Sequence, residues 1–187
     1  GNYDVVQPAS QTANITPAPL SVSTSNVVRQ YDGTTNASGT AVVTAGTLFA
    51  GDSLTGGAFS FADRHVGTGK TVNVSGFTLT GTDAGNYNLI GPTGLTATIN
   101  KANLTPTGGV TANSKVYDGT TVATVSGTAS VTALGADAVS LIASGRFNDK
   151  NVGTNKAVTV TYALVGPDSG NYDVVQPASQ TANITPA

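Results

Sequence analysis

GNYDVVQPASQTANITPA stands at residues 1–18, and the same eighteen residues return unchanged at 170–187. A related version opens at residue 85, so the signature Gly-Asn-Tyr begins at positions 1, 85 and 170, a period of 84 to 85 residues. A long, regular period is typical of an array of similar domains. The sequence therefore predicts two full repeats.

The period also predicts the domain boundaries. The first repeat is expected over residues 16–100 and the second over 101–187. Residues 1–15 match the last part of a repeat, so we expect the terminal hairpin of a preceding, truncated repeat, in an internal fragment of a longer protein. Because an isolated two-stranded hairpin is marginal in water, it should be ordered only by packing on the first repeat or on another molecule.

The composition favours β-structure and excludes several function classes. Cys, Met, Trp and Glu are absent, and only 10% of the residues are charged. Val and Thr fit pleated strands, whereas Gly, Asn and Asp supply turns. A net charge of -2 argues against a nucleic-acid or anionic-membrane partner. No apolar run approaches the roughly 20 residues of a membrane helix, and the lack of cysteine rules out disulfides and thiolate metal sites.

Three short motifs recur in the same order in both repeats. The first is Tyr-Asp-Gly-Thr-Thr, two residues after a basic residue, the second is Asp-x-x-Val-Gly-Thr-x-Lys, and the third is Gly-x-Asp-x-Gly-Asn-Tyr. Asp-Gly is a strong turn signal, and we expect the preceding Tyr to anchor the turn to the core. The residues that we assign to the structural motif are Tyr31, Asp32, Gly33, Gly85, Asn86, Tyr87, Tyr117, Asp118, Gly119, Gly170, Asn171 and Tyr172.

The strand pattern predicts an all-β fold. In the second repeat, apolar residues alternate without interruption over 158–164, whereas the matching strand of the first repeat changes phase at Ser75-Gly76, which predicts a β-bulge. Residues 87–90 and 95–99 resemble a closing hairpin. Short joints are predicted at residues 16–19 and 100–103. We expect two tandem, antiparallel β-sandwich-like domains that form an elongated rod, with β-grasp-like units as the alternative.

Taken together, the three motifs resemble the YDG and related MBG repeat domains of large bacterial adhesins, among them filamentous-haemagglutinin-like exoproteins secreted by the two-partner route. The resemblance covers residues 16–187. It implies extracellular, non-enzymatic repeats that stack in tandem at the bacterial cell surface. The repeats differ where the first has Arg64-His65 and the second Lys150-Asn151, so we predict tolerant surface positions there.

Candidate chemistry is sparse, and we expect no enzyme. His65 is the only histidine, and its counterpart in the second repeat is Asn151. The glycine-rich residues 66–70 lack the spacing of a phosphate loop, and an isopeptide bond at Lys70 or Lys156 would lack the usual Glu. No cofactor is expected except possible calcium, since hard cations prefer clustered oxygen ligands. The calcium candidates are the Asp residues that recur in turns: Asp32, Asp63, Asp83, Asp118, Asp149 and Asp168.

The expected function is mechanical. The repeats would be the stalk of a secreted adhesin, extending a binding region from the cell for adhesion or biofilm formation. In the alternative, the repeats themselves bind matrix polysaccharide or a host surface glycan weakly and multivalently. The expected partners are neighbouring repeats of the same polypeptide, with no nucleic acid and no membrane insertion, and we expect the fragment to be monomeric.

Overall fold

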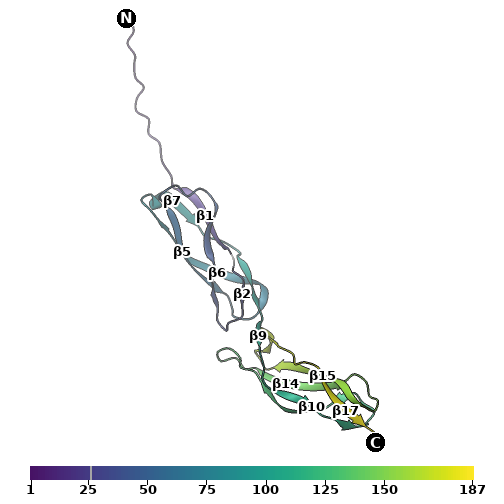
Figure 1. Ribbon diagram of the computed structural model, residues 1–187. Coiled ribbons are helices and arrows are strands. Elements are labelled where there is room, and N and C mark those ends of the chain that lie inside the picture. The colour runs from purple at the N-terminus through teal and green to yellow at the C-terminus, as the bar shows by residue number, and fades with distance from the viewer. Residues whose placement is uncertain (26) are drawn as a thin grey trace. The chain divides into compact units, whose positions relative to one another are not determined.

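The structure is a computed structural model that describes residues 1–25 and 27–187, and it confirms the predicted all-β class (Figure 1). Within these residues the helical segments are two short 3-10 turns, η1 (Ala84–Asn86) and η2 (Ser169–Asn171). No helix in the described part of the chain is long and apolar enough to cross a membrane. Each 3-10 turn contains the Gly-Asn of the third motif.

The described residues of the first repeat form eight strands in two sheets. A five-stranded sheet has the order β2-β8-β6-β5-β3, and a three-stranded sheet has the order β4-β1-β7. The strands are β1 (Ala18–Ser25), β2 (Arg29–Gln30), β3 (Asn36–Ala37), β4 (Thr40–Ala45), β5 (Ser53–Phe61), β6 (Gly67–Thr80), β7 (Tyr87–Ile90) and β8 (Thr96–Asn100).

The second repeat has the same plan. Its five-stranded sheet has the order β11-β17-β15-β14-β12, and two-stranded sheets are formed by β10 with β13 and by β16 with β9. Two strands, β9 and β10, take the place of β1. The strands are β9 (Ala102–Leu104), β10 (Thr107–Ala112), β11 (Lys115–Val116), β12 (Val122–Ala123), β13 (Val125–Ser130), β14 (Ser140–Phe147), β15 (Gly153–Val165), β16 (Tyr172–Val174) and β17 (Gln180–Thr185).

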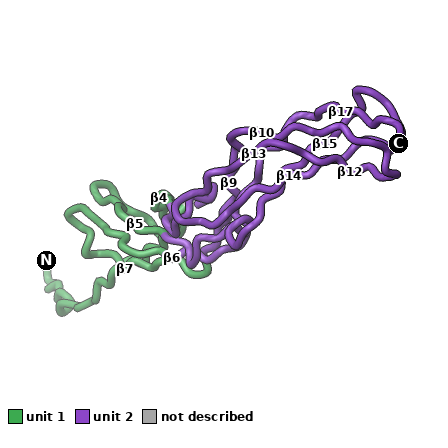
Figure 2. Tube along the Cα trace, turned by 90° about the horizontal axis from the view of Figure 1, so that it is seen from below, with its two compact units in different colours: residues 1–26, 38–59, 74–94 green, residues 27–37, 60–73, 95–187 purple. Residues whose placement is uncertain are grey.

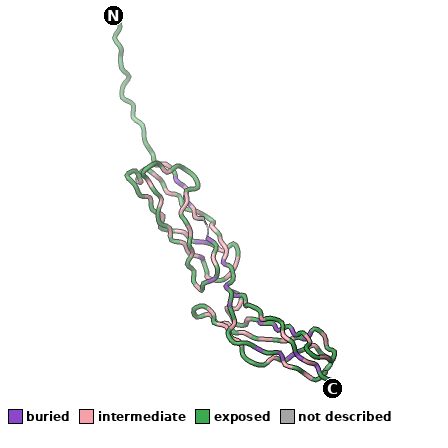
Figure 3. The backbone as a smooth tube through the Cα atoms, in the orientation of Figure 1, coloured by how far each residue is buried: buried purple, intermediate pink, exposed green. Residues whose placement is uncertain are grey.

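The core of the second repeat lies between the five-stranded sheet and the β10–β13 pair (Figure 3). Along β15, Val158, Val160 and Tyr162 are buried and alternate with exposed residues, as the sequence predicts. Phe147 from β14 and Ile184 from β17 complete the centre, each 1% exposed. These large side chains meet the smaller Val110 and Ala112 of β10, which gives the two-layer packing of a sandwich.

The change of phase in β6 is confirmed. Val72 and Val74 lie on the inner side, Ser75 and Gly76 are both exposed, and Phe77 is half-buried again. Gly76 has a φ of 72°, a conformation that glycine adopts without steric cost. Phe77 packs edge-on against Phe59 of β5, with ring centroids 6.1 Å apart. The extra residue therefore keeps the large side chains on one face, as a bulge does.

The predicted closing hairpin is wrong, because its two strands enter different sheets. β7 pairs in parallel with β1, matching Ala18 with Tyr87, whereas β8 pairs with β6 and β2. The second repeat behaves in the same way, since β16 pairs in parallel with β9 while β17 pairs with β15 and β11. Each repeat therefore contains parallel as well as antiparallel pairs.

The predicted hairpin at residues 1–15 is also absent. Residues 1–17 form no strand, and Tyr3, Val6 and Ile15 are almost fully exposed. The strands that pair with the identical C-terminal copy, β9, β11 and β15, all belong to the second repeat. The predicted joints are shorter than expected: Ala18 already belongs to β1, and only Lys101 separates β8 from β9.

Two compact units divide the chain differently from the repeats (Figure 2). Unit 1 contains residues 1–26, 38–59 and 74–94, and unit 2 contains residues 27–37, 60–73 and 95–187. Unit 2 thus combines the whole second repeat with the Tyr-Asp-Gly turn and the β5–β6 connection of the first. The repeat boundaries at 16–100 and 101–187 stay a prediction.

Candidate functional site

The Tyr-Asp-Gly motif forms a turn that is closed by its own side chains. Asp32 accepts a hydrogen bond from the Thr34 backbone N–H at 2.8 Å and pairs with the Arg29 guanidinium at 2.6 Å. The second repeat reproduces both contacts. There Lys115 pairs with Asp118 at 2.7 Å, and the pKa of Asp118 is lowered to about 2, chiefly by this hydrogen bond. The basic residue of the motif therefore neutralises the turn carboxylate.

The second motif closes another turn in the same manner. Asp63 accepts a hydrogen bond from the His65 backbone N–H at 2.9 Å and forms an ion pair with Lys70. Its counterpart Asp149 pairs with Lys156 at 2.6 Å. Each lysine considered for an isopeptide bond thus ends on the carboxylate of its own motif.

The Tyr of the third motif contacts an Asp that the motifs do not include. In the second repeat, the Tyr172 hydroxyl donates to Asp137 Oδ2 at 2.7 Å and accepts from the Leu134 backbone N–H at 3.0 Å. In the first repeat, Tyr87 donates to Asp52 at 2.8 Å and accepts from the Phe49 N–H at 3.1 Å. Sequence reasoning missed both Asp residues. The available signal was their constant spacing of 35 residues before the Tyr.

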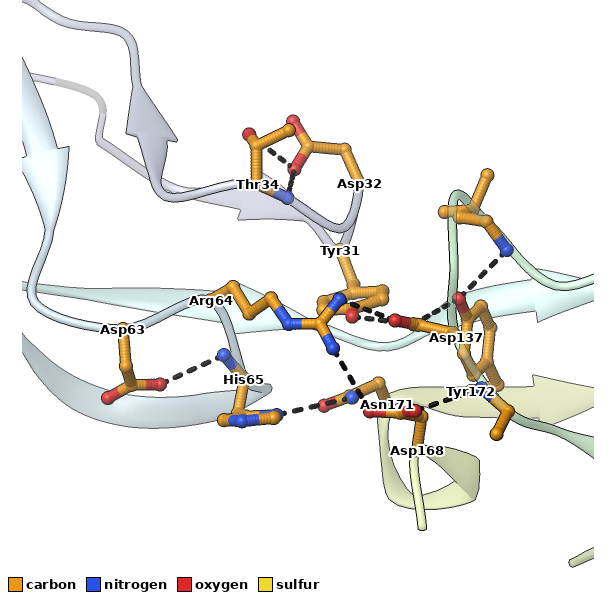
Figure 4. Close-up of polar contacts among 12 residues, drawn as sticks. Tyr31, Asp32, Thr34, Asp63, Arg64, His65, Asp137, Asp168, Asn171 and Tyr172 are labelled. Carbon is orange, nitrogen blue, oxygen red and sulfur yellow. Dashed lines mark hydrogen bonds and ion pairs between the residues drawn. The ribbon is translucent and has the colours of Figure 1, made fainter. Parts of the chain in front are cut away.

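Asp137 is also where the first repeat contacts the second. The Tyr31 hydroxyl donates to Asp137 Oδ2 at 2.6 Å, and the ring of Tyr31 packs edge-on against Tyr172 with centroids 5.3 Å apart (Figure 4). Arg64 forms an ion pair with Asp137 and contacts Asp168 at 3.2 Å. The Asp137 side chain is 0% exposed. We call Tyr31, Arg64, Asp137, Asp168 and Tyr172 the junction cluster.

Further contacts beside the cluster involve Asn171. This residue is buried, accepts a hydrogen bond from the Val66 backbone N–H at 3.1 Å, and contacts His65 Nδ1 at 3.3 Å through its side-chain nitrogen (Figure 4). The prediction that Arg64-His65 are tolerant surface positions is therefore wrong. His65 is exposed, as expected, yet both residues contact the second repeat.

The two Tyr-Asp-Gly turns differ in burial. Tyr31 is 2% exposed, whereas its counterpart Tyr117 is 39% exposed. The expected anchoring role therefore fails for Tyr117. For Tyr31 the anchor is the junction cluster, because its hydroxyl reaches Asp137 of the second repeat.

Burial and hydrogen bonding act in opposite directions at Asp137. Burial alone would raise its pKa, but the hydrogen bonds from Tyr31, Tyr172 and Arg64 outweigh it and lower the pKa. For the tyrosines both effects have the same sign. Burial and the bond to Asp137 raise the pKa of Tyr31 well above its usual value, and they raise that of Tyr172 to about 12. The cluster therefore favours an ionised Asp137 between neutral phenols.

The six calcium candidates are not gathered into one site. No group of three or more His, Asp or Glu side chains suited to a metal lies in the described part of the chain. Four of the six, Asp32, Asp63, Asp118 and Asp149, accept hydrogen bonds from their own turn backbone. Asp83 and Asp168 precede η1 and η2. Asp168 also accepts a bond from the Ala138 backbone N–H at 2.9 Å, which fixes the loop beside Asp137.

Comparison with protein families finds the YDG domain twice, at residues 16–97 and 100–182. No curated protein and no solved structure matches the chain. The two matched segments contain both Tyr-Asp-Gly turns and both Tyr–Asp pairs, and together they cover most of the sequence. The chain belongs to the YDG domain family and contains two tandem copies of that domain.

Proposed function

We propose that the chain is a structural stalk segment of a secreted bacterial surface adhesin, acting outside the cell to extend a binding region for adhesion or biofilm formation. In this proposal the repeats are not enzymes. Their partners are neighbouring repeats of the same polypeptide. The adhesin context comes from the resemblance of the sequence motifs, and the mechanical role is supported by the junction cluster.

The observation that carries the proposal is that side chains of both repeats contact the same carboxylate, that of Asp137. Asp137 receives Tyr172 from its own repeat and Tyr31 and Arg64 from the preceding one. A flexible linker would let neighbouring domains move independently, whereas side-chain contacts across a one-residue connection oppose bending. A spacer needs this property, because a chain that bends freely at each joint spans less distance.

The test is single-molecule stretching of the chain held by its two ends. We expect two unfolding events of comparable length, each releasing about 30 nm of contour before the folded length is subtracted, since a residue spans at most about 3.5 Å. Both repeats should refold when the force is released. A single event, or failure to refold under repeated cycles, would contradict the role of a mechanical spacer.

The alternative function, weak binding of matrix polysaccharide or host glycan by the repeats, needs a separate measurement. The chain is applied to a glycan array and to immobilised matrix polysaccharide at high concentration. The stalk proposal expects no saturable binding. Saturable binding that is lost on mutation of exposed residues of the repeats would favour the alternative.

A further inference from the structure

The first repeat contains its own copy of the Asp137 acceptor. Asp52 receives the Tyr87 hydroxyl at 2.8 Å, and that hydroxyl accepts the Phe49 N–H at 3.1 Å, the same two bonds that Tyr172 makes with Asp137 and Leu134. The strand pairing beside it is equivalent as well. Ala18 pairs with Tyr87 in the first repeat as Ala102 pairs with Tyr172 in the second.

The surface around Asp52 has an open cavity, whereas Tyr31 and Arg64 of the first repeat fill the equivalent place around Asp137. We call these the open site and the filled site. A cavity of about 480 Å³ lies beside Asp52 and is lined by Phe49, Asp83 and Tyr87, among others. Phe49 is 61% exposed. At the corresponding position Leu134 is 38% exposed and lies beside the Tyr-Asp-Gly turn of the first repeat, since a Cβ on Gly33 would stand 4.0 Å from the Leu134 Cβ. The aromatic ring of Phe49 is thus more exposed than the Leu134 side chain at the corresponding position.

The second repeat exposes a turn, at Tyr117, that matches the turn at Tyr31. The turn at Tyr117 has the internal bonds of the turn at Tyr31, because Lys115 pairs with Asp118 as Arg29 pairs with Asp32. Its tyrosine, unlike Tyr31, is 39% exposed. Lys150 occupies the position of Arg64 in the second motif and is exposed.

Charge supports the match. In the filled site, Arg64 contacts Asp137 and Asp168. The open site offers the corresponding carboxylates Asp52 and Asp83, the latter placed immediately before η1 as Asp168 is before η2. A lysine ammonium at the position of Arg64 can pair with either carboxylate, although not in the forked manner of a guanidinium.

We propose that the Asp52 face of one molecule binds the Tyr117 turn of a second copy of this chain, with Tyr117 donating to Asp52 and Lys150 near Asp83. The contact is head-to-tail, because it joins different surfaces of the two copies, and it can therefore propagate. It is weak, because the contact is small and exposed charges on Lys150 and Asp83 are screened by salt. The chain is mainly monomeric when dilute and associates when concentrated.

Ile15 and Thr16 also line this cavity. They belong to no strand, and Ile15 is fully exposed. Moving them aside therefore breaks no strand pairing. In the second copy, Ile184 and Thr185 are identical to Ile15 and Thr16 and already pair with β11. They would therefore enter the interface together with the Tyr117 turn of that copy.

The first experiment is disulfide trapping, for which the chain is suited because it has no cysteine. One preparation carries Phe49→Cys and the other Gly119→Cys. Phe49 corresponds to Leu134, and Gly119 corresponds to Gly33. In the first-to-second repeat contact, the Cβ positions of Leu134 and Gly33 are 4.0 Å apart, which is within the range of a disulfide. We expect the mixed preparation to give a cross-linked heterodimer under mild oxidation. Adding Tyr117→Ala to the Gly119→Cys chain should lower its yield about tenfold.

The matched control places Gly33→Cys and Leu134→Cys in one chain and should give the intramolecular bond of the filled site. Heterodimer no more abundant than the homodimers of each variant, or unaffected by Tyr117→Ala, would overturn the proposal. Gly119 has a φ of 79°, where a side chain is strained, so Gly119→Cys could disturb the turn. The second measurement is therefore sedimentation equilibrium of the protein without introduced cysteines. The average mass should rise with concentration, and Tyr117→Ala and Asp52→Asn should each suppress the rise. A mass that is constant, or unchanged by both variants, would also refute the proposal.

Discussion

The Tyr31 hydroxyl provides the sharpest test of the junction cluster, because its removal leaves the rest of the side chain in place. Tyr31→Phe deletes a hydrogen bond of 2.6 Å to Asp137 and keeps the ring that packs edge-on against Tyr172. The same substitution in the second repeat, Tyr117→Phe, removes a hydroxyl from an equivalent turn whose tyrosine is exposed. The two variants therefore differ in the junction and not in the turn.

The expected loss follows from the acceptor. A hydrogen bond to a charged group contributes about 1.5 to 3 kcal/mol, more than one between neutral groups. The Asp137 carboxylate is 0% exposed, so water cannot replace the missing donor, but Tyr172 and Arg64 continue to pair with it. We therefore expect Tyr31→Phe to cost about 2 kcal/mol. Tyr117→Phe should change the stability by less than about 0.5 kcal/mol, as is usual at exposed positions.

The assay is urea denaturation followed by far-UV circular dichroism, together with hydrogen exchange of the Leu134 amide. That amide donates to Tyr172 inside the cluster, so its protection reports local opening there. A double-mutant cycle with Asp137→Asn then isolates the pair: the cost of Tyr31→Phe should fall by at least half when the acceptor is no longer charged. If Tyr31→Phe costs no more than Tyr117→Phe, or costs the same with Asn at position 137, the junction does not act through this hydrogen bond.

Further predictions address pH, backbone strain and metal. Because the pKa of Asp137 is lowered in the folded state, ionised Asp137 adds to the free energy of unfolding above its unfolded pKa of about 4, and this stability is lost as the pH falls below that value. Urea titrations should therefore show a larger loss of stability in acid for the native chain than for Asp137→Asn. The raised pKa values of Tyr31 and Tyr172 predict the converse above about pH 10, where the unfolded chain ionises first, and Tyr31→Phe should reduce that alkaline loss. Gly166→Ala should destabilise the fold by about 2 kcal/mol or more, since Gly166 has a φ of 120° and a Cβ there would collide with the Ala138 carbonyl oxygen. Gly170→Ala is the control and should cost little, because the space around Gly170 is open. Thermal melting compares the two variants. Excess chelator should leave the melting temperature unchanged, because four of the six calcium candidates are already bound to turn amides, and a fall of several degrees would restore calcium to the structure.

What the sequence predicted well depends on neighbouring residues. The Asp-Gly turns, the alternation along β15 and the change of phase at Ser75-Gly76 all follow from local backbone and burial patterns. These features are set within a few residues, and a short window contains the necessary information. The same holds for the turn carboxylates, which bond the backbone two residues further on.

What the sequence did not predict depends on partners far along the chain. The segments at 87–90 and 95–99 have the composition of a hairpin, but the partner of β7 is β1, about seventy residues earlier. Asp137 has no local pattern, since its bonds come from residues 35, 73 and 106 positions away. The difference between Arg64-His65 and Lys150-Asn151 was misread for the same reason. A comparison of repeats treats their surroundings as equal, although Arg64 and His65 lie beside residues of the following repeat.

The duplicated eighteen residues show how far partners determine conformation in this fold. At 170–187 the segment forms β16 and β17, and Ile184 is 1% exposed, whereas at 1–18 the copy Ile15 is 101% exposed and residues 1–17 form no strand. The side chains of Gln176 and Gln180 bond the backbone of Tyr162 and of Val110 and Ala112, and they link the segment to β15 and β10. Burying one Ile contributes about 1.5 to 3 kcal/mol, while ordering each backbone residue costs about 1 to 2 kcal/mol. Strand formation in this segment therefore requires the sheet of a complete repeat, and its sequence alone is insufficient.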